Sequence, residues 1–171
     1  MIETLAPSLL TPPGEGLVPV WQWLLATWFG TGLVAPLRAG LAVAITIPVV
    51  LLLMRGPRLA VPLFGLAILV VGIYAASAIE LAAGIVDDRR IVIDEVGACV
   101  LGAALLRGAG WPLVTIFAAA LLTLDKLKPW PFYLFEALPR GWGVMLDDLP
   151  VGLTLGIAFA AFRIWQGRSH A

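Results

Sequence analysis

Long apolar stretches make up most of this chain, and short clusters of charged residues, glycine and proline interrupt them. An apolar run of about 20 residues is long enough to cross a bilayer as a helix. Residues 59–84 reach that length and contain a single acid, Glu80, near their end. The other apolar stretches are shorter, and each predicts a helix; they cover residues 17–33, 40–54, 94–106, 111–124 and 150–165.

The first stretch, residues 17–33, differs from the others in its tryptophans. Because tryptophan favours the membrane–water interface, we expect an interfacial or half-buried helix here. It ends in the turn Phe29-Gly30-Thr31-Gly32, where glycine permits positive φ angles and a close backbone approach. The turn has two interpretations, a simple helix stop or a set of backbone amides that bind an anion.

Composition points to a membrane protein. The chain is 61% hydrophobic and 13% charged, whereas a soluble domain is about 25% charged. A core built from 171 residues could not hide so much apolar surface. The predicted fold is all-α, a compact multi-helix integral membrane bundle with short or re-entrant helices. The net charge is zero, which argues against a nucleic-acid partner.

One domain is expected. Residues 1–16 are rich in proline and glycine and contain no basic residue, so they predict a flexible N-terminal tail rather than a secretory signal. Residues 17–166 form the single helical membrane domain of this prediction, and residues 167–171 form a C-terminal tail.

The order of the helices predicts where the charges gather. If the five runs after residue 33 each cross the membrane, then the turn at Gly30 and the segments 87–95 and 125–148 lie on one side. The turns at Arg55 and Arg107 lie on the other side. Lysine and arginine do not fix the orientation, because six of the eleven fall on the first side and five on the second.

Two pairs of acids lie next to predicted helix starts. Asp94 and Glu95 begin the helix 94–106, and Asp147 and Asp148 precede the helix 150–165. Acids at these places also cap free backbone amides and complement the helix dipole. Both pairs therefore have a structural interpretation beside a functional one.

Asp125 has no such structural interpretation. It follows the helix 111–124 and therefore faces the negative end of the helix dipole, where an acid is disfavoured. It needs a cation, which Lys126, Lys128 or a bound metal would provide. The two lysines also have a structural interpretation, since lysine side chains extend toward lipid headgroups.

Five carboxylates on one membrane face suit a hard divalent ion such as Mg²⁺, which takes oxygen ligands and often bridges carboxylates to a substrate phosphate. The residues that other kinds of phosphate-processing site require are missing from this sequence. The only histidine is His170, next to the last residue, and Cys99 lies in an apolar run without the arginine of a thiol phosphatase loop. No Walker loop and no G-x-S-x-G elbow is present.

Three motifs resemble the phosphatidylglycerophosphatase A family. They are Ile91-Val92-Ile93-Asp94-Glu95-Val96-Gly97, then Asp125-x-x-Lys128-Pro129-Trp130-Pro131, then Gly141-x-Gly143-x-Met145-x-Asp147-Asp148-x-x-x-Gly152. The resemblance runs from about Phe29 to Phe162. It implies an Mg²⁺-dependent membrane phosphatase that converts phosphatidylglycerophosphate to phosphatidylglycerol. It also implies a multi-pass protein of the bacterial inner membrane with its site on the cytoplasmic side.

The resemblance carries functional residues onto matching positions. We assign the metal to Asp94, Asp125, Asp147 and Asp148, and catalysis to Glu95, which acts on the attacking water, with Asp125 and Lys128. Substrate binding is assigned to Gly30, Thr31, Gly32, Lys126, Lys128 and Arg140. The expected partners are a phospholipid substrate and the membrane, and a homo-oligomer is an open alternative.

The sequence also departs from the family pattern, as a divergent member with an eroded N-terminal glycine-rich motif. Leu122 stands where the family often has arginine, Arg38-Ala39-Gly40 replaces Pro-Gly-Thr, and Arg140-Gly141 replaces a glycine pair. Arg38 and Arg140 are candidates to replace the lost cation. The alternative function is a catalytically impaired scaffold that binds an anionic lipid or a partner protein. A cation-conducting bundle is a third interpretation, which explains Lys-Pro-Trp-Pro poorly.

Overall fold

The computed structural model describes residues 11–85, 87–127 and 131–169, and within these ranges it contains helices and turns but no strand. This confirms the all-α prediction. In chain order the elements are α2 (Val20–Ala26), η1 (Thr31–Leu33), α3 (Arg38–Met54), α4 (Ala60–Ala83), α5 (Ile93–Ala103), η2 (Ala104–Leu106), α6 (Trp111–Leu127), η3 (Phe132–Ala137), α7 (Gly141–Asp147) and α8 (Leu149–Ser169).

Two stretches are long and apolar enough to cross a membrane. They are α4 and the continuous stretch Gly141–Gln166, which joins α7 to α8. Both carry large hydrophobic side chains on their outer surface, for example Leu63 on α4 and Ile157 on α8. The finding supports a membrane protein, and the number of crossings stays a prediction.

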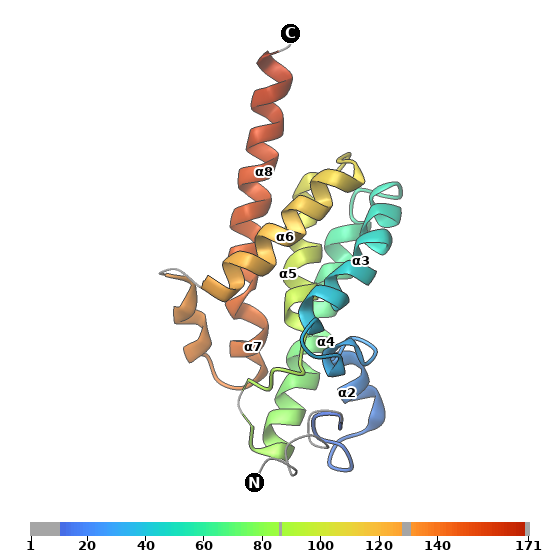
Figure 1. Cartoon of the computed structure of the whole chain (residues 1–171), viewed down its shortest axis with the longest axis vertical. Coiled ribbons are helices and arrows are strands. Elements are labelled where there is room, and N and C mark those ends of the chain that lie inside the picture. The colour runs from blue at the N-terminus through green and yellow to red at the C-terminus, as the bar shows by residue number, and fades with distance from the viewer. Residues whose placement is uncertain (1–10, 86, 128–130, 170–171) are drawn as a thin grey trace.

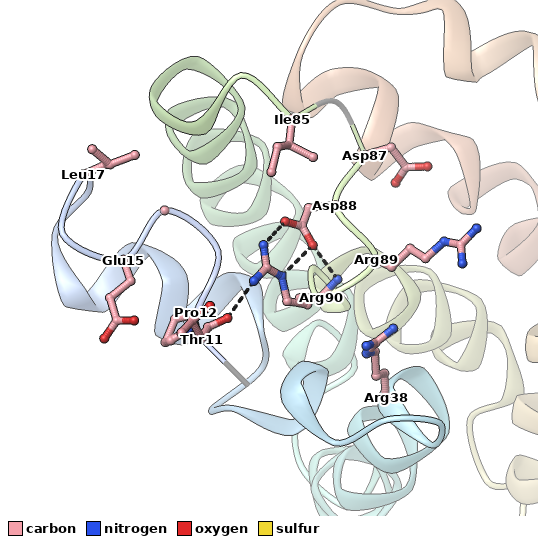
Figure 2. A pocket seen from close by; sticks show the side chains of 11 residues that line it. Thr11, Pro12, Glu15, Leu17, Arg38, Ile85, Asp87, Asp88, Arg89 and Arg90 are labelled. Carbon is pink, nitrogen blue, oxygen red and sulfur yellow. Dashed lines mark hydrogen bonds and ion pairs between the residues drawn. The ribbon is translucent and has the colours of Figure 1, made fainter. Parts of the chain in front are cut away.

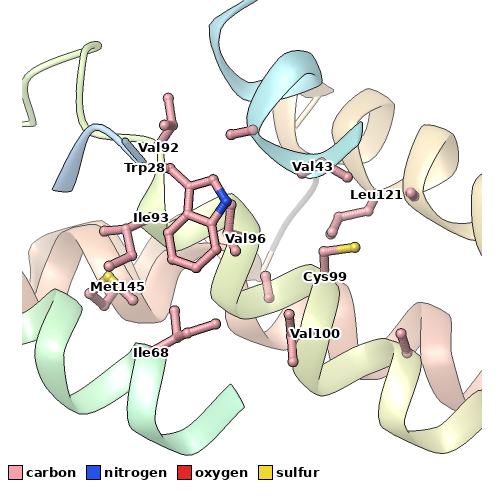
Figure 3. Close-up of a cluster of buried hydrophobic side chains, with 14 of the residues drawn as sticks. Trp28, Val43, Ile68, Val92, Ile93, Val96, Cys99, Val100, Leu121 and Met145 are labelled. Atoms are coloured by element: carbon pink, nitrogen blue, oxygen red, sulfur yellow. The ribbon is translucent and has the colours of Figure 1, made fainter. Parts of the chain in front are cut away.

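Helix α5 lies at the centre of the bundle, in contact with α3, α4, α6, α7 and α8. Figure 1 shows α5 between α3 and α8, while α8 extends beyond the other helices. Nearly every residue of α5 is buried. Figure 3 shows Val96, Cys99 and Val100 of this helix among side chains from other elements, including Trp28 and Met145. The acids in the first turn of α5 therefore lie inside the bundle rather than on its surface.

Glycines let the backbones of α5 and α8 approach closely. A Cβ atom on Gly152 would lie 2.5 Å from the Ala98 carbonyl oxygen, and one on Gly156 would lie 2.5 Å from that of Gly102. Small residues at such crossings are the usual basis of close helix packing in membranes. The contact places the start of α8 beside the first half of α5.

The segment before α5 is held by polar contacts that the sequence did not reveal. Arg90 donates from Nε to Asp88 Oδ1 at 2.9 Å and from Nη1 to the Thr11 carbonyl at 2.7 Å (Figure 2). Burial opposes ionisation of Asp88, but the hydrogen bonds and charge of Arg90 outweigh it and hold the pKa of Asp88 below its ordinary value. The Val92 N–H also donates to the Ala26 carbonyl at 2.9 Å. The segment that leads into α5 is thus held by hydrogen bonds both to residue 11 and to the end of α2.

The turns at the opposite end meet as the helix order predicts. Arg107 donates to the carbonyls of Gly56 and Pro57. Arg163 of α8 donates in turn to the Arg107 carbonyl at 3.1 Å. The α3–α4 and α5–α6 turns therefore lie together, away from the segments that carry the acids.

Several predicted boundaries are wrong. The helix expected from residue 17 is shorter, since α2 covers only Val20–Ala26; the turn expected after it is present, with φ angles of 57° and 86° at Phe29 and Gly30. Helix α7 was not predicted, and α6 and α8 run past their expected ends at residues 124 and 165. The flexible tail over residues 1–16 stays a prediction; within it, Pro13 and Gly14 are buried.

Candidate functional site

The five suspected carboxylates come together from three places in the fold. Asp94 and Glu95 lie in the first turn of α5, Asp125 lies in the last turn of α6, and Asp147 and Asp148 lie where α7 passes into α8. All five line one hollow of about 470 Å³, which we call the carboxylate hollow. Its lining also includes Asp87, Arg89, Ile91 and Lys126.

The carboxylates form two overlapping triplets. One consists of Asp94, Asp147 and Asp148, and the other of Glu95, Asp125 and Asp148. Within each triplet, one carboxyl oxygen from every residue lies within 4.8 Å of the others. Asp148 belongs to both triplets, so it stands at the centre of the cluster.

Burial makes this cluster unfavourable on its own. Asp147 and Asp148 are 4% and 2% exposed, and like charges in a low dielectric repel strongly. In the described part of the chain, Asp94 Oδ1 and Glu95 Oε2 are buried and accept no hydrogen bond. Such orphaned anionic oxygens call for a cation. An all-carboxylate donor set is the kind that hard ions such as Mg²⁺ take, so the residues fit a magnesium ion.

Helix capping does not explain the acids of α5. The N-cap of α5 is Val92, and no side chain caps the helix there. Asp94 and Glu95 instead line the carboxylate hollow. The capping part of the structural interpretation is therefore not supported, whereas both acids do lie in the first turn of α5, where they complement the helix dipole. Their functional role stays a prediction.

The two predicted lysines differ in what the structure says of them. Lys126 is exposed and lines the carboxylate hollow next to Asp125, which is half-buried. Lys128 lies outside the described residues. A positive side chain at the rim of the hollow is placed to meet an anionic substrate.

The residues Gly30, Thr31 and Gly32 do not line the carboxylate hollow. The Thr31 hydroxyl donates to the carbonyls of Thr27 and Trp28, and the amides of all three residues donate within the same loop. This favours the helix-stop interpretation over an anion site. A Cβ on Gly32 would collide with the Arg90 carbonyl, so the loop supports the segment before α5, and its contact with substrate stays a prediction.

Arg140 lines a second hollow of about 380 Å³, which adjoins the carboxylate hollow because Asp87 and Asp147 line both. Its backbone has φ 57° and ψ −150°, a region that residues other than glycine rarely adopt. The next residue, Gly141, donates its N–H to Ser77 Oγ at 3.1 Å. Arg140 therefore lies beside the carboxylates, and its contact with substrate stays a prediction.

Sequence reasoning missed Asp87 and Arg89 as residues of the site. Both line the carboxylate hollow and are exposed. They belong to the charge run that directly precedes the Asp94–Glu95 motif, on the side of the membrane where the acids were expected to gather. That position was a usable signal, although a run of this kind is usually a solvated loop.

Comparison with known proteins agrees with this geometry. A family model described as phosphatidylglycerophosphatase A matches residues 24–163. A phosphatidylglycerophosphatase A from Haemophilus influenzae is 30% identical over 146 residues, which cover 84% of this chain and 89% of the relative. No solved structure matches the chain significantly.

Proposed function

The chain belongs to the phosphatidylglycerophosphatase A family of phosphoric monoester hydrolases, and from this premise we propose that it removes the terminal phosphate of phosphatidylglycerophosphate in an Mg²⁺-dependent reaction. The carboxylate hollow supports the proposal. Five acids from three places in the fold converge there. Burying several carboxylates together costs free energy, and a purely structural role would not require it.

We assign Asp94, Asp125, Asp147 and Asp148 to the metal, because their oxygens approach one another within the two triplets. Bound there, Mg²⁺ would supply Lewis-acid polarisation of the phosphoryl oxygens. The strongest support for this metal assignment is the buried oxygen of Asp94 that accepts no hydrogen bond. Asp148 would hold the cluster together, since it belongs to both triplets.

The remaining residues handle the proton and the phosphate charge. Glu95 lies in the triplet with Asp125 and Asp148, and its buried, donor-free oxygen is placed to take a proton from the attacking water. Lys126 at the rim would attract the phosphate, and Lys128 and Arg140 are proposed to contact it.

We further propose a multi-pass protein of the bacterial inner membrane with the site facing the cytoplasm. Membrane association itself is supported by the two candidate spans and by the family. All five acids lie away from the α3–α4 and α5–α6 turns. That separation supports the proposal that the chemistry takes place at one membrane face.

The test is phosphate release from phosphatidylglycerophosphate by the purified protein in detergent, with Mg²⁺ and with chelator. Release should depend on the metal and fall at least 100-fold in Asp125→Asn, while the control Arg58→Gln, exposed in the α3–α4 turn and outside the carboxylate hollow, keeps full activity. Full activity of Asp125→Asn would refute the assignment of the site. No release of phosphate from any lipid phosphate by a folded sample would favour the scaffold interpretation.

A further inference from the structure

A third hollow, of about 700 Å³, lies between residues 11–17, the start of α3 and the residues Ile85 and Asp87–Arg90. We call it the arginine hollow, after Arg38, Arg89 and Arg90 (Figure 2). It adjoins the carboxylate hollow, because Asp87 and Arg89 line both. A ligand longer than one phosphate group can therefore occupy the two hollows together.

Two of the three arginines are available to a ligand. Arg90 is engaged by Asp88, whose two oxygens it binds, and by the Thr11 carbonyl. Arg38 is half-buried, and its Nε is buried without an acceptor among the residues that the structure describes. Arg89 is exposed and makes no ion pair within the same part of the chain.

The acids around the arginine hollow do not satisfy these two guanidinium groups. Asp88 attracts Arg38 electrostatically, but its hydrogen bonds go to Arg90. Figure 2 shows Glu15 on the opposite side of the hollow from Arg38, and Asp87 directed away from the Asp88–Arg90 pair. A buried guanidinium N–H without an acceptor is unfavourable, and an anion would satisfy it.

We propose that Arg38 and Arg89 bind the phosphodiester of a lipid headgroup whose terminal phosphomonoester occupies the carboxylate hollow. The inference rests on the proposed function and adds the basis of its specificity. Guanidinium groups bind phosphate oxygens through paired, charge-assisted hydrogen bonds. The enzyme then recognises two anionic groups, of which it cleaves one and holds the other.

The assignment also gives a role to one departure from the family pattern. Arg38 begins the segment Arg38-Ala39-Gly40, for which the resemblance leads one to expect Pro-Gly-Thr. The side chain rises from the start of α3 toward the loop that carries Arg89 (Figure 2).

The test separates the diester from the monoester. Kinetics with Mg²⁺ would be measured on phosphatidylglycerophosphate, which carries both groups, and on phosphatidic acid, which carries only a monoester. Arg38→Gln and Arg89→Gln should each lower kcat/KM for the first lipid by roughly tenfold or more, mainly through KM. Hydrolysis of phosphatidic acid should not change in Arg38→Gln, and in Arg89→Gln it should fall less than hydrolysis of phosphatidylglycerophosphate, because Arg89 also lines the carboxylate hollow. The control Arg58→Gln, in the α3–α4 turn, should behave as the native protein on both lipids.

A binding measurement makes the inference testable apart from catalysis. Phosphatidylglycerol carries the diester alone, so its dissociation constant from the native protein in detergent micelles should rise in both variants. Unchanged phosphatidylglycerol binding, or an equal loss of activity on the two substrates, would overturn the inference. Failure of the native protein to release phosphate, with binding still weakened in the variants, would refute the proposed reaction alone. Because Arg89 is exposed, Arg89→Gln carries the test if Arg38→Gln does not fold.

Discussion

Replacing Gly152 with alanine tests whether the α5–α8 contact positions the carboxylates. A Cβ at this residue would lie 2.5 Å from the Ala98 carbonyl oxygen and 3.2 Å from the Ala98 Cβ. Alanine is otherwise favoured over glycine inside a helix by about 1 kcal/mol. The sign of the effect therefore depends on whether α8 can move away from α5.

The magnitude follows from the missing space. Ordinary contact for a Cβ begins at 3.4 Å, so α8 must retreat by roughly 1 Å at this point. Overpacking of this kind costs about 1–3 kcal/mol. Asp148 lies one turn before Gly152, and it would move relative to Asp94. A displacement of about 1 Å in a catalytic group can lower the rate about 100-fold.

The assay combines thermal unfolding in detergent with kcat for phosphate release. Gly152→Ala should lower Tm by about 2–12 °C and lower kcat by at least tenfold. The matched control is Gly40→Ala in α3, where a Cβ would have no neighbour within 4 Å. A Gly152→Ala protein as stable and active as this control would show that the helix contact does not set the site geometry.

Two further predictions concern charge. Mg²⁺ should raise the Tm of the native protein by binding the folded state, and it should do so much less in Asp94→Asn; an equal rise in both would remove Asp94 from the metal site. The pKa of Asp88 is held below its ordinary value, so the Asp88–Arg90 pair stabilises the fold above the unfolded-state pKa of about 4 and loses that effect as pH falls through the folded-state pKa. Unfolding midpoints between pH 3 and 7 should therefore fall less steeply in Asp88→Asn than in the native protein, and parallel curves would contradict the role of the pair.

The sequence predicted the convergence of the acids well because that result needs little detail. Each apolar run reverses the direction of the chain, so alternate connections share a face. This simple alternation brought Asp94, Asp125 and Asp148 together. Asp125 was recognised because it lies at the wrong end of a helix dipole, a local property that the sequence shows directly.

Other features depend on tertiary contacts that leave no local signal. Helix α7 contains Gly141 and Gly143 and reads as a turn, yet Gly141 packs against the Ile73 carbonyl of α4, where a Cβ would not fit. The Asp88–Arg90 pair has the spacing of an ordinary solvated charge run. The pair also contacts the N-terminal segment, since Arg90 donates to the Thr11 carbonyl, and no pattern in the sequence predicts this contact.

The length of α8 has a consequence for which lipids the protein can reach. Asp148 precedes the helix, and Trp165, which is exposed, lies near its other end. At 1.5 Å per residue, Asp148 and Trp165 are roughly 26 Å apart along the axis, close to the thickness of the bilayer's hydrocarbon core of about 30 Å. If α8 crosses the membrane as proposed, a tryptophan suited to one interface and the carboxylates at the other would confine the proposed reaction to a single leaflet. Lipids of the opposite leaflet would then have to be flipped first, and the direction of insertion would decide which pool of lipid is consumed.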